Sequence, residues 1–423
     1  MLSAMPDPKK TQFRPETLAI VSGYNPEDAS RSAKPPVYMT ATFTYPSAQV
    51  AKDVHRAYFD GDGPEAGGSG HIYSRLGHPG LDILEERLAA IDGTEAALAY
   101  CSGMAAHTAV ALAYLKPGEG VVHGRPFYSG VDGLFNEIMP QFGSHSAYWT
   151  DGCDEANMWA ACEAAMAKGP VAMLAAESPG NPTAALVDLD LLVKIAGRVE
   201  AAQGRRPIVM VDNTLLGPFH QRPFEHGVDL CVTSLTKYCA GHSDLLAGAI
   251  TGRKDLIEPL KLQRLVWGSH LDPYTAWLVL RSLETVSLRT ERAMENALKV
   301  AEWLKAHPKV AGVTYLGFTP EGTPARAVFE RQCKGAGSTF SFHLHGGEAE
   351  AFRMLDSLKL LKMAVNLGGS NTLICHSAST THYAVAREMR LASGITDGTI
   401  RVSVGLEHID DIIADLAQAM EAV

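Results

Sequence analysis

The sequence predicts an α/β protein with a mostly parallel central sheet. Short, mainly apolar runs of strand length occur at 96–100, 120–123, 171–176, 207–211, 230–233 and 245–250. Helical or polar segments separate most of these runs, which is typical of a parallel sheet. Apolar runs rich in β-branched residues, such as 207–211, favour strands buried on both faces. We therefore expect ligand-binding side chains at the carboxyl edge of this sheet.

The first elements of this region alternate between helix and strand. Residues 81–91 carry apolar side chains at helical spacing and stop at Asp92-Gly93, a typical helix end. A strand at 96–100 follows. The chain then turns at residues 101–104 into an alanine-rich helix at 105–115.

The composition changes after about residue 285, which indicates a second, smaller domain. Residues 289–307 have the pattern of a long helix that ends at His307-Pro308. Strand patterns follow at 338–345 and 400–404, and 408–422 is an amphipathic helix pattern. We expect an α+β domain packed on the first. The predicted domains are an N-terminal arm at 1–77, an α/β domain with the ligand-binding sheet edge at 78–285 and a C-terminal α+β domain at 286–423.

The first 77 residues show little periodic structure and contain the glycine-rich run 61–70. Such a stretch cannot build its own core, and a long loop of this kind is normally functional or disordered. Its aromatic residues Tyr38, Phe43 and Tyr45 are explained by an arm that packs on a neighbouring subunit.

Composition and charge exclude several classes of partner. The 423 residues carry a formal net charge of −10, which argues against nucleic acid and anionic membranes. No window approaches the roughly 20 apolar residues of a membrane helix, and Met1–Pro15 lacks the apolar core of a signal peptide. The seven scattered cysteines include no Cys-x-x-Cys pair. We therefore expect reduced thiols, no metal site and a cytoplasmic location.

Two motifs at predicted strand ends indicate a cofactor. Val211-Asp212-Asn213-Thr214 closes one apolar run, and Ser234-Leu235-Thr236-Lys237-Tyr238 closes the next. Parallel strands would bring a carboxylate, an amine and two hydroxyls to one edge. Pyridoxal phosphate needs a lysine for its aldehyde and an acid for its pyridinium nitrogen. Hydroxyls and backbone N–H groups can bind its phosphate.

The segment from Ser234 to Gly248 resembles the pyridoxal-lysine segment of the cysteine/methionine-metabolism family. That family includes cystathionine γ-synthase, cystathionine lyases, methionine γ-lyase and O-acylhomoserine sulfhydrylases. The resemblance implies a type I pyridoxal-enzyme fold, like that of aspartate aminotransferase. It also implies that Lys237 binds the aldehyde, that Asp212 faces the ring nitrogen, and that Ser234 and Thr236 bind the phosphate.

Three further motifs match the family around the cofactor. Ser102-Gly103-Met104 lies at a strand-to-helix turn, where the resemblance assigns phosphate binding to Gly103 and Met104. In Phe127-Tyr128-Ser129-Gly130, Tyr128 matches the tyrosine that stacks on the ring and acts as an acid or base. Methionine γ-lyases carry a cysteine where this chain has Gly130. In the motif 177–183, Asn181 matches the residue that faces the cofactor's 3′-oxygen.

The motif Tyr73-Ser74-Arg75 resembles a family segment that reaches the phosphate in a neighbouring subunit. An arginine suits that role because its planar fork binds phosphate oxygens. The resemblance therefore implies that Tyr73 and Arg75 complete a partner's site. The expected assembly is a dimer, paired into a homotetramer by two-fold symmetry.

The substrate side of the expected site departs from the family pattern. Arg401 alternates with apolar residues along its strand and matches the residue that binds the substrate α-carboxylate. Asn366 replaces the usual serine and should touch the substrate carboxylate or the Lys237 amine. Asn371 replaces a glutamate, and His270 stands where a small apolar residue is usual. Together with loop 61–70, these differences suggest a substrate with a polar side chain.

The resemblance implies an enzyme that acts at Cγ of a methionine- or homoserine-derived amino acid. We expect a γ-elimination lyase that releases an α-keto acid and ammonia, with canavanine among the polar candidates. The alternative is a γ-replacement enzyme, such as cystathionine γ-synthase or an O-acylhomoserine sulfhydrylase. A nucleotide-dependent dehydrogenase should show Gly-x-Gly-x-x-Gly after its first strand, and this sequence does not.

Overall fold

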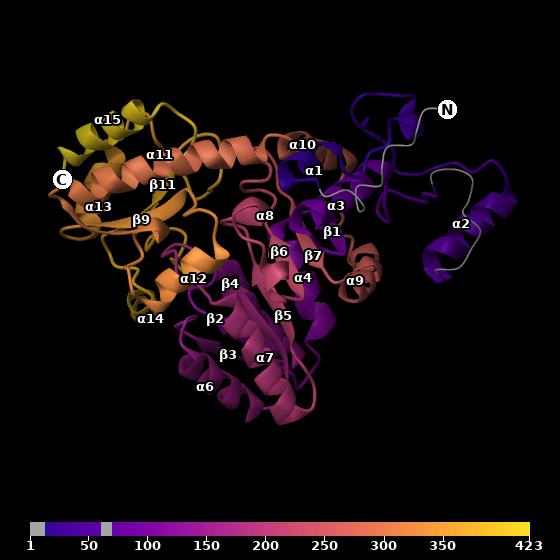
Figure 1. Cartoon of the computed structure of the whole chain (residues 1–423), viewed down its shortest axis with the longest axis horizontal. Coiled ribbons are helices and arrows are strands. Elements are labelled where there is room, and N and C mark those ends of the chain that lie inside the picture. Colours follow the sequence, from indigo (N-terminus) through magenta and orange to yellow (C-terminus); the bar gives the residue numbers. More distant parts are fainter. Residues whose placement is uncertain (1–12, 61–69) are drawn as a thin grey trace.

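A mixed sheet of seven strands forms the centre of the larger part of the molecule (Figure 1). The computed structural model describes residues 13–60 and 70–423. The sheet order is β1 (Ala96–Tyr100), β7 (Gly248–Gly252), β6 (Leu230–Thr233), β5 (Ile208–Asp212), β4 (Val171–Glu177), β2 (Gly120–Gly124) and β3 (His145–Trp149). Only β7 runs against its neighbours within this sheet. The predicted α/β class with a mostly parallel sheet is confirmed.

Helices cover both faces of this sheet, which explains why its strands, apart from the edge strand β3, are buried and mainly apolar. On one face, α4 (Gly103–Tyr114) and α9 (Lys254–Trp267) bury Val110 and Leu260 against the strands. On the other face, α6 (Glu155–Met166) and α7 (Leu189–Gln203) contribute a second cluster of buried side chains. A third cluster joins α3 (Pro79–Asp92) and α10 (Pro273–Leu283) to β1 and β7.

A second sheet of five strands belongs to the C-terminal part, drawn in orange and yellow in Figure 1. Its order is β10 (Lys362–Met363), β11 (Leu373–His376), β12 (Thr399–Ser403), β9 (Thr339–Leu344) and β8 (Val310–Thr314). The helices α11 (Val286–Ala306), α13 (Glu348–Asp356) and α15 (Ile409–Met420) share one buried cluster with these strands. The long α11 runs along this smaller sheet (Figure 1).

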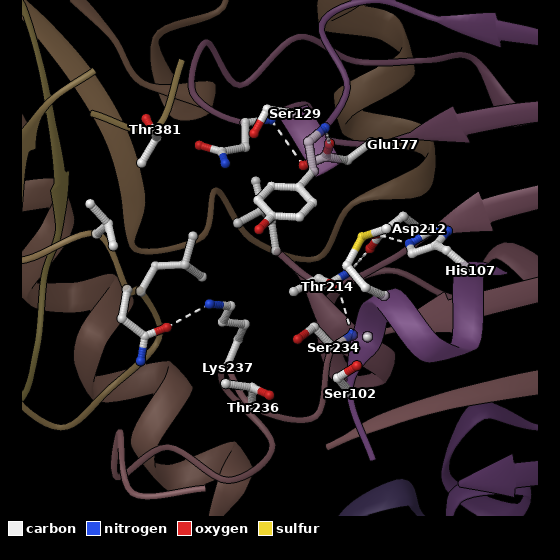
Figure 2. A pocket seen from close by; sticks show the side chains of 18 of the residues that line it. Ser102, His107, Ser129, Glu177, Asp212, Thr214, Ser234, Thr236, Lys237 and Thr381 are labelled. Atoms are coloured by element: carbon white, nitrogen blue, oxygen red, sulfur yellow. Dashed lines mark hydrogen bonds and ion pairs between the residues drawn. The ribbon is translucent and has the colours of Figure 1, made fainter. Parts of the chain in front are cut away.

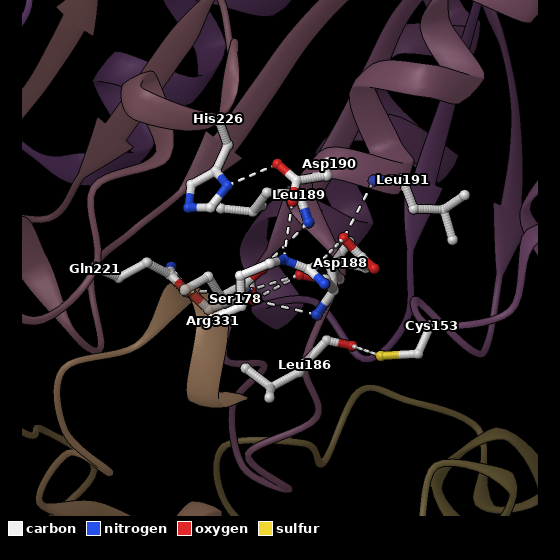
Figure 3. Close-up of polar contacts among 12 residues, drawn as sticks. Cys153, Ser178, Leu186, Asp188, Leu189, Asp190, Leu191, Gln221, His226 and Arg331 are labelled. Carbon is white, nitrogen blue, oxygen red and sulfur yellow. Dashed lines mark hydrogen bonds and ion pairs between the residues drawn. The ribbon is translucent and has the colours of Figure 1, made fainter. Parts of the chain in front are cut away.

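Polar contacts fasten the C-terminal part to the large sheet (Figure 3). Arg331, at the end of α12 (Pro324–Gln332), pairs with Asp188 and, at 2.8 Å, with Asp190 beside the start of α7. The buried amide of Gln332 donates to the carbonyl of Val187 at 2.9 Å. These contacts fix the position of the second sheet, and with it Arg401 on β12, relative to the strand ends of the first.

The N-terminal segment contains more regular structure than the sequence predicts. Residues 15–21 and 48–60 are helical, so the expectation of little regular structure before residue 78 is wrong there. The first helix packs against α3, whereas the second buries only Val54 and stands away from both sheets (Figure 1). The glycine-rich run at 61–70 lies almost wholly outside the described residues.

Ten further helices occur in the described residues. They are α1 (Pro15–Val21), η2 (Pro26–Ala29), α2 (Ala48–Asp60), α5 (Ser129–Gly133), η3 (Leu134–Ile138), η4 (Met139–Phe142), α8 (Gly217–His220), η5 (Pro223–His226), η6 (Leu316–Phe318) and α14 (Arg387–Ala392). In the parts of the chain that the structure describes, no helix combines the length and apolar character needed to cross a membrane.

Candidate active site

A pocket of about 480 Å³ lies at the carboxyl edge of the large sheet, between it and the C-terminal part. Most of the predicted site residues line it. They are Gly103, Met104, Tyr128, Asn181, Asp212, Ser234, Thr236, Lys237, Asn366 and Arg401. Their elements explain the convergence, because the parallel strands β4, β5 and β6 end side by side. Glu177 ends β4 beside Asp212, which ends β5.

Close packing shapes the corner predicted to bind phosphate. The Ser102 hydroxyl accepts the Ala105 N–H at 3.1 Å and so caps the N-terminus of α4. A Cβ atom at Gly103 would lie 2.9 Å from the Ser234 Cβ, so only glycine allows α4 to approach Ser234 this closely. The Thr236 hydroxyl is bound to the backbone of Ala247. The helix N-terminus beside Ser234 is the kind of site where N–H groups bind phosphate oxygens.

Asp212 is buried and held from two sides (Figure 2). Its Oδ1 accepts the backbone N–H of Thr214 at 2.9 Å. Its Oδ2 lies 2.9 Å from Nε2 of His107, a residue of α4 that also lines the pocket. Sequence reasoning missed His107. Its position one helical turn after Gly103, on the same face of an otherwise apolar helix, could have identified it.

Glu177 anchors the wall that carries Tyr128 and Asn181. Its two carboxyl oxygens accept the backbone N–H groups of Tyr128 at 2.6 Å and Asn181 at 3.1 Å. Burial, and then the neighbouring Asp212 carboxylate, raise the pKa of Glu177 well above its usual value. The sequence motif contained Glu177, but it gave no indication that this side chain positions two predicted site residues.

Gly130 leaves space beside Tyr128. A Cβ atom at Gly130 would lie 2.9 Å from Cε1 of the Tyr128 ring and 3.0 Å from Sδ of Met104. A cysteine here, which the family resemblance associates with methionine γ-lyases, would therefore displace one of these side chains. The absence of a side chain at Gly130 therefore allows the Tyr128 ring to occupy its position.

Lys237 contacts the opposite wall of the pocket. Its Nζ donates a hydrogen bond to Oδ1 of Asn366 at 2.5 Å (Figure 2). Burial, and then the positive charge of Arg401, lower the pKa of Lys237 to about 8. The amine is therefore more easily deprotonated than an ordinary lysine, as a group that reacts with an aldehyde or moves protons must be.

Arg401 is buried and lines the pocket instead of facing solvent. Its guanidinium donates to Oδ1 of Asn181 at 3.3 Å and to the carbonyls of Val365 and Asn366 at 2.9 and 3.1 Å. These contacts fix the planar fork, the geometry that binds a carboxylate best.

The other residues singled out on the substrate side lie outside this pocket. His270 is half-buried and its ring contacts the carbonyl of Gly268, two residues away. Asn371 is not among the residues that line the pocket. Thr380 and Thr381, which sequence reasoning did not identify, do line it.

Tyr73 and Arg75 do not line the pocket of their own chain. Tyr73 is exposed, and Arg75 donates to the carbonyl of Leu265 at the end of α9. Neither residue therefore contributes to the pocket of its own chain.

The donor set of the pocket fits pyridoxal 5′-phosphate. A partly buried amine with a lowered pKa suits the aldehyde, and a buried carboxylate suits a protonated ring nitrogen. The space that Gly103 keeps free beside Ser234 provides a cradle at a helix N-terminus for the phosphate.

Comparisons with known proteins agree with this chemistry. The chain matches the family described as Cys/Met metabolism PLP-dependent enzymes over residues 16–421. It is 38% identical over 410 residues to an L-methionine gamma-lyase of Pseudomonas putida, covering 96% of this chain and 97% of that protein. It is 31% identical to an O-acetyl-L-homoserine sulfhydrylase of Leptospira meyeri, with 97% of each chain covered.

A solved structure from Campylobacter jejuni has the same fold, with a TM-score of 0.86 and 30% identity. The match covers 97% of this chain and 100% of that one, which carries N′-pyridoxyl-lysine-5′-monophosphate. The chain belongs to the Cys/Met metabolism PLP-dependent enzymes, with a type I pyridoxal-enzyme fold and pyridoxal 5′-phosphate as its cofactor.

Proposed function

We propose that this protein is a lyase that eliminates the γ-substituent of a methionine- or homoserine-derived amino acid. The products are an α-keto acid, ammonia and the released γ-group. The observation that carries the proposal is the pocket itself, in which Lys237, Tyr128 and Arg401 face one space. Relatives of 34–38% identity that are named L-methionine gamma-lyase, matched over nearly their full length, support the same reaction.

Each side chain has a definite task in this proposal. The bound cofactor supplies an electron sink next to the substrate Cα. Arg401 binds the substrate carboxylate, and Asn366 contributes an amide to the same corner. Lys237 takes the proton from Cα and then moves a proton at Cβ, for which a pKa of about 8 is suited. Tyr128 donates a proton to the departing γ-group.

Asp212, Asn181 and the phosphate corner act on the cofactor rather than on the substrate. Asp212 holds the proton on the ring nitrogen, and Asn181 faces the 3′-oxygen. Gly103 and Met104 bind the phosphate with the hydroxyls of Ser234 and Thr236. The Thr236 hydroxyl already forms hydrogen bonds with the backbone of Ala247. To bind the phosphate as well, it would have to divide its hydrogen bonds between Ala247 and the phosphate.

A γ-replacement enzyme is the second candidate, because it uses the same residues up to the point where a thiol adds. The sulfhydrylase relatives, at 31% and 33% identity, favour it. The two reactions differ in whether an added thiol is consumed.

An assay of methionine, cystathionine, O-acylhomoserines and canavanine, with and without added thiol, tests the proposal. We expect α-keto acid and ammonia in equal amounts without thiol. Substrate consumption that requires a thiol, without ammonia release, would instead identify a γ-replacement enzyme.

We further propose a homotetramer built from two dimers, in which the arm at 1–77 completes the partner's site. Tyr73 and Arg75 would bind the partner's cofactor phosphate. The exposed apolar side chains Leu262, Val266 and Trp267 on α9 support a subunit contact close to Arg75.

Subunit mixing tests this arrangement. Inactive Arg75→Ala and inactive Lys237→Ala proteins should regain part of the activity when mixed, since some hybrid dimers contain one intact site. A fully active monomer at assay concentration would contradict a shared site.

We also propose a cytoplasmic location and a small amino acid as the partner of the site, with no role for nucleic acid or membrane. Support comes from the net charge of −10 and from the seven cysteines, each of which is unpaired. We also propose that the domains of the chain meet near residues 77 and 285.

A further inference from the structure

His107 is a buried polar side chain to which the proposed reaction assigns no task. It lies on α4, is 3% exposed, and lines the pocket. Figure 2 shows its ring beyond Asp212, on the side away from Lys237. Its Nε2 is 2.9 Å from Oδ2 of Asp212.

The surroundings of the ring decide which nitrogen carries the proton. Asp212 as a carboxylate can only accept, so Nε2 of His107 must be the donor. The other nitrogen, Nδ1, is buried and has no hydrogen-bond partner among the described residues. The nitrogen of His107 that donates to Asp212 is therefore Nε2.

This arrangement leaves Asp212 oriented and still able to accept. The carboxylate has about four lone-pair directions. The Thr214 N–H occupies one on Oδ1, and the His107 N–H occupies one on Oδ2. The carboxylate is thus held by two donors from different elements, and its remaining directions are available to the pocket.

We propose that His107 is a positioning residue that holds the Asp212 carboxylate towards the ring nitrogen of pyridoxal 5′-phosphate. The inference concerns cofactor binding, so it stands or fails separately from the γ-elimination. The Nε2 donor suits this role because it holds Oδ2 in place from the side of α4 and leaves other lone pairs of the carboxylate free for the ring nitrogen.

Two substitutions separate the hydrogen bond from the volume of the ring. His107→Leu keeps an apolar side chain of similar size and removes the donor. His107→Gln places an amide Nε2 at the same number of bonds from the backbone and keeps it. We expect His107→Leu to bind the cofactor on the order of tenfold to a hundredfold more weakly, because it loses a hydrogen bond to a charged group. His107→Gln should recover most of that affinity.

Titration of the cofactor-free proteins, followed by the absorbance of the bound cofactor, gives these affinities. The same titration with a cofactor analogue whose ring nitrogen is replaced by CH provides a sharper readout. This analogue has no ring nitrogen for Asp212 to contact. His107→Leu should therefore bind it as well as the parent protein does.

His123 provides a matched control. It is also a fully buried histidine, its ring lies 6.3 Å from that of Phe127, and it does not contact Asp212. His123→Leu should leave the affinity ratio between cofactor and analogue unchanged. An equal loss for cofactor and analogue in His107→Leu, an identical change in His123→Leu, or no rescue by His107→Gln would overturn the proposal.

Discussion

The two walls of the pocket are built differently. The cofactor wall consists of residues 102–104, 212–214 and 234–237, which lie at strand ends and one helix start of the large sheet. The substrate wall consists of residues 365–367, 380–381 and Arg401, which come from the C-terminal part. The first wall follows the family pattern. The second departs from it at Asn366.

The difference follows from how each wall is positioned. Strands β1, β5 and β6 of one hydrogen-bonded sheet position the cofactor wall, so its residues cannot change their relative positions without disturbing that sheet. The substrate wall depends on the docking of a separate sheet through contacts such as Arg331 with Asp188. A change of substrate can therefore arise in the second wall while the first keeps the cofactor in place.

The largest expected effect is on the cofactor wall. Lys237→Ala should lose the visible absorbance of the lysine-bound cofactor and at least about a thousandfold in rate, because the proposed function gives this one side chain both the aldehyde and the proton transfers. Borohydride trapping followed by peptide mapping checks the assignment. Label on a different lysine would show that this wall has been assigned wrongly.

The second prediction concerns the positive charge of Lys237, whose amine belongs to the cofactor wall and contacts Asn366 of the substrate wall. The pKa of Lys237 is about 8 in the folded protein, against 10.5 for an ordinary lysine. Between these values the unfolded chain binds a proton that the folded chain has released. The resulting destabilisation is fully present below pH 8 and disappears above about pH 10.5. The cofactor-free protein should therefore gain up to about 3 kcal/mol of stability from this group as the pH rises.

Urea unfolding of the cofactor-free parent and of Lys237→Met at both ends of this range measures the effect. The stability advantage of Lys237→Met near pH 7.5 should shrink at pH 10.5. An advantage that stays constant with pH would mean that the folded protein does not lower the pKa of Lys237.

The third prediction concerns the binding of the substrate carboxylate by Arg401 in the substrate wall. Arg401→Leu should lose roughly a hundredfold in kcat/KM, mainly through a higher KM, because a bound carboxylate loses its buried partner. Arg401→Lys keeps the charge without the planar fork and should recover only part of the loss. Steady-state kinetics separate the two constants. Little change in KM would place the substrate carboxylate elsewhere.

The smallest effect concerns the departure from the family pattern. Asn366 contacts Lys237, so Asn366→Ser should shift the ratio of kcat/KM for methionine against a polar substrate by about tenfold towards methionine. The sequence suggested the same for His270→Val. Because His270 does not line the pocket, we expect that variant to keep the parent ranking. An unchanged ranking in Asn366→Ser would mean that this asparagine does not select the substrate.

Most of the large sheet could be predicted from the sequence because its evidence is local. Apolar runs and the polar residues directly after them placed Asp212 and Lys237 at strand ends. Helix α2 was missed although its apolar residues Val50, Val54 and Tyr58 recur at helical spacing, so the sequence did contain the pattern of this helix. The antiparallel direction of β7, by contrast, left no local pattern.

The sequence by itself determined the α/β class, the cofactor motifs and the residue types available to the site. Only the tertiary structure decided which of these residues meet. Arg401 contacts Asn181 from 220 positions away, Lys237 meets Asn366 across 129 positions, and His107 meets Asp212 across 105. Helical and strand periodicity describe a residue's own element, whereas these pairs depend on how separate elements pack. For that reason, only the folded structure shows that His107 lines the pocket and that His270 does not.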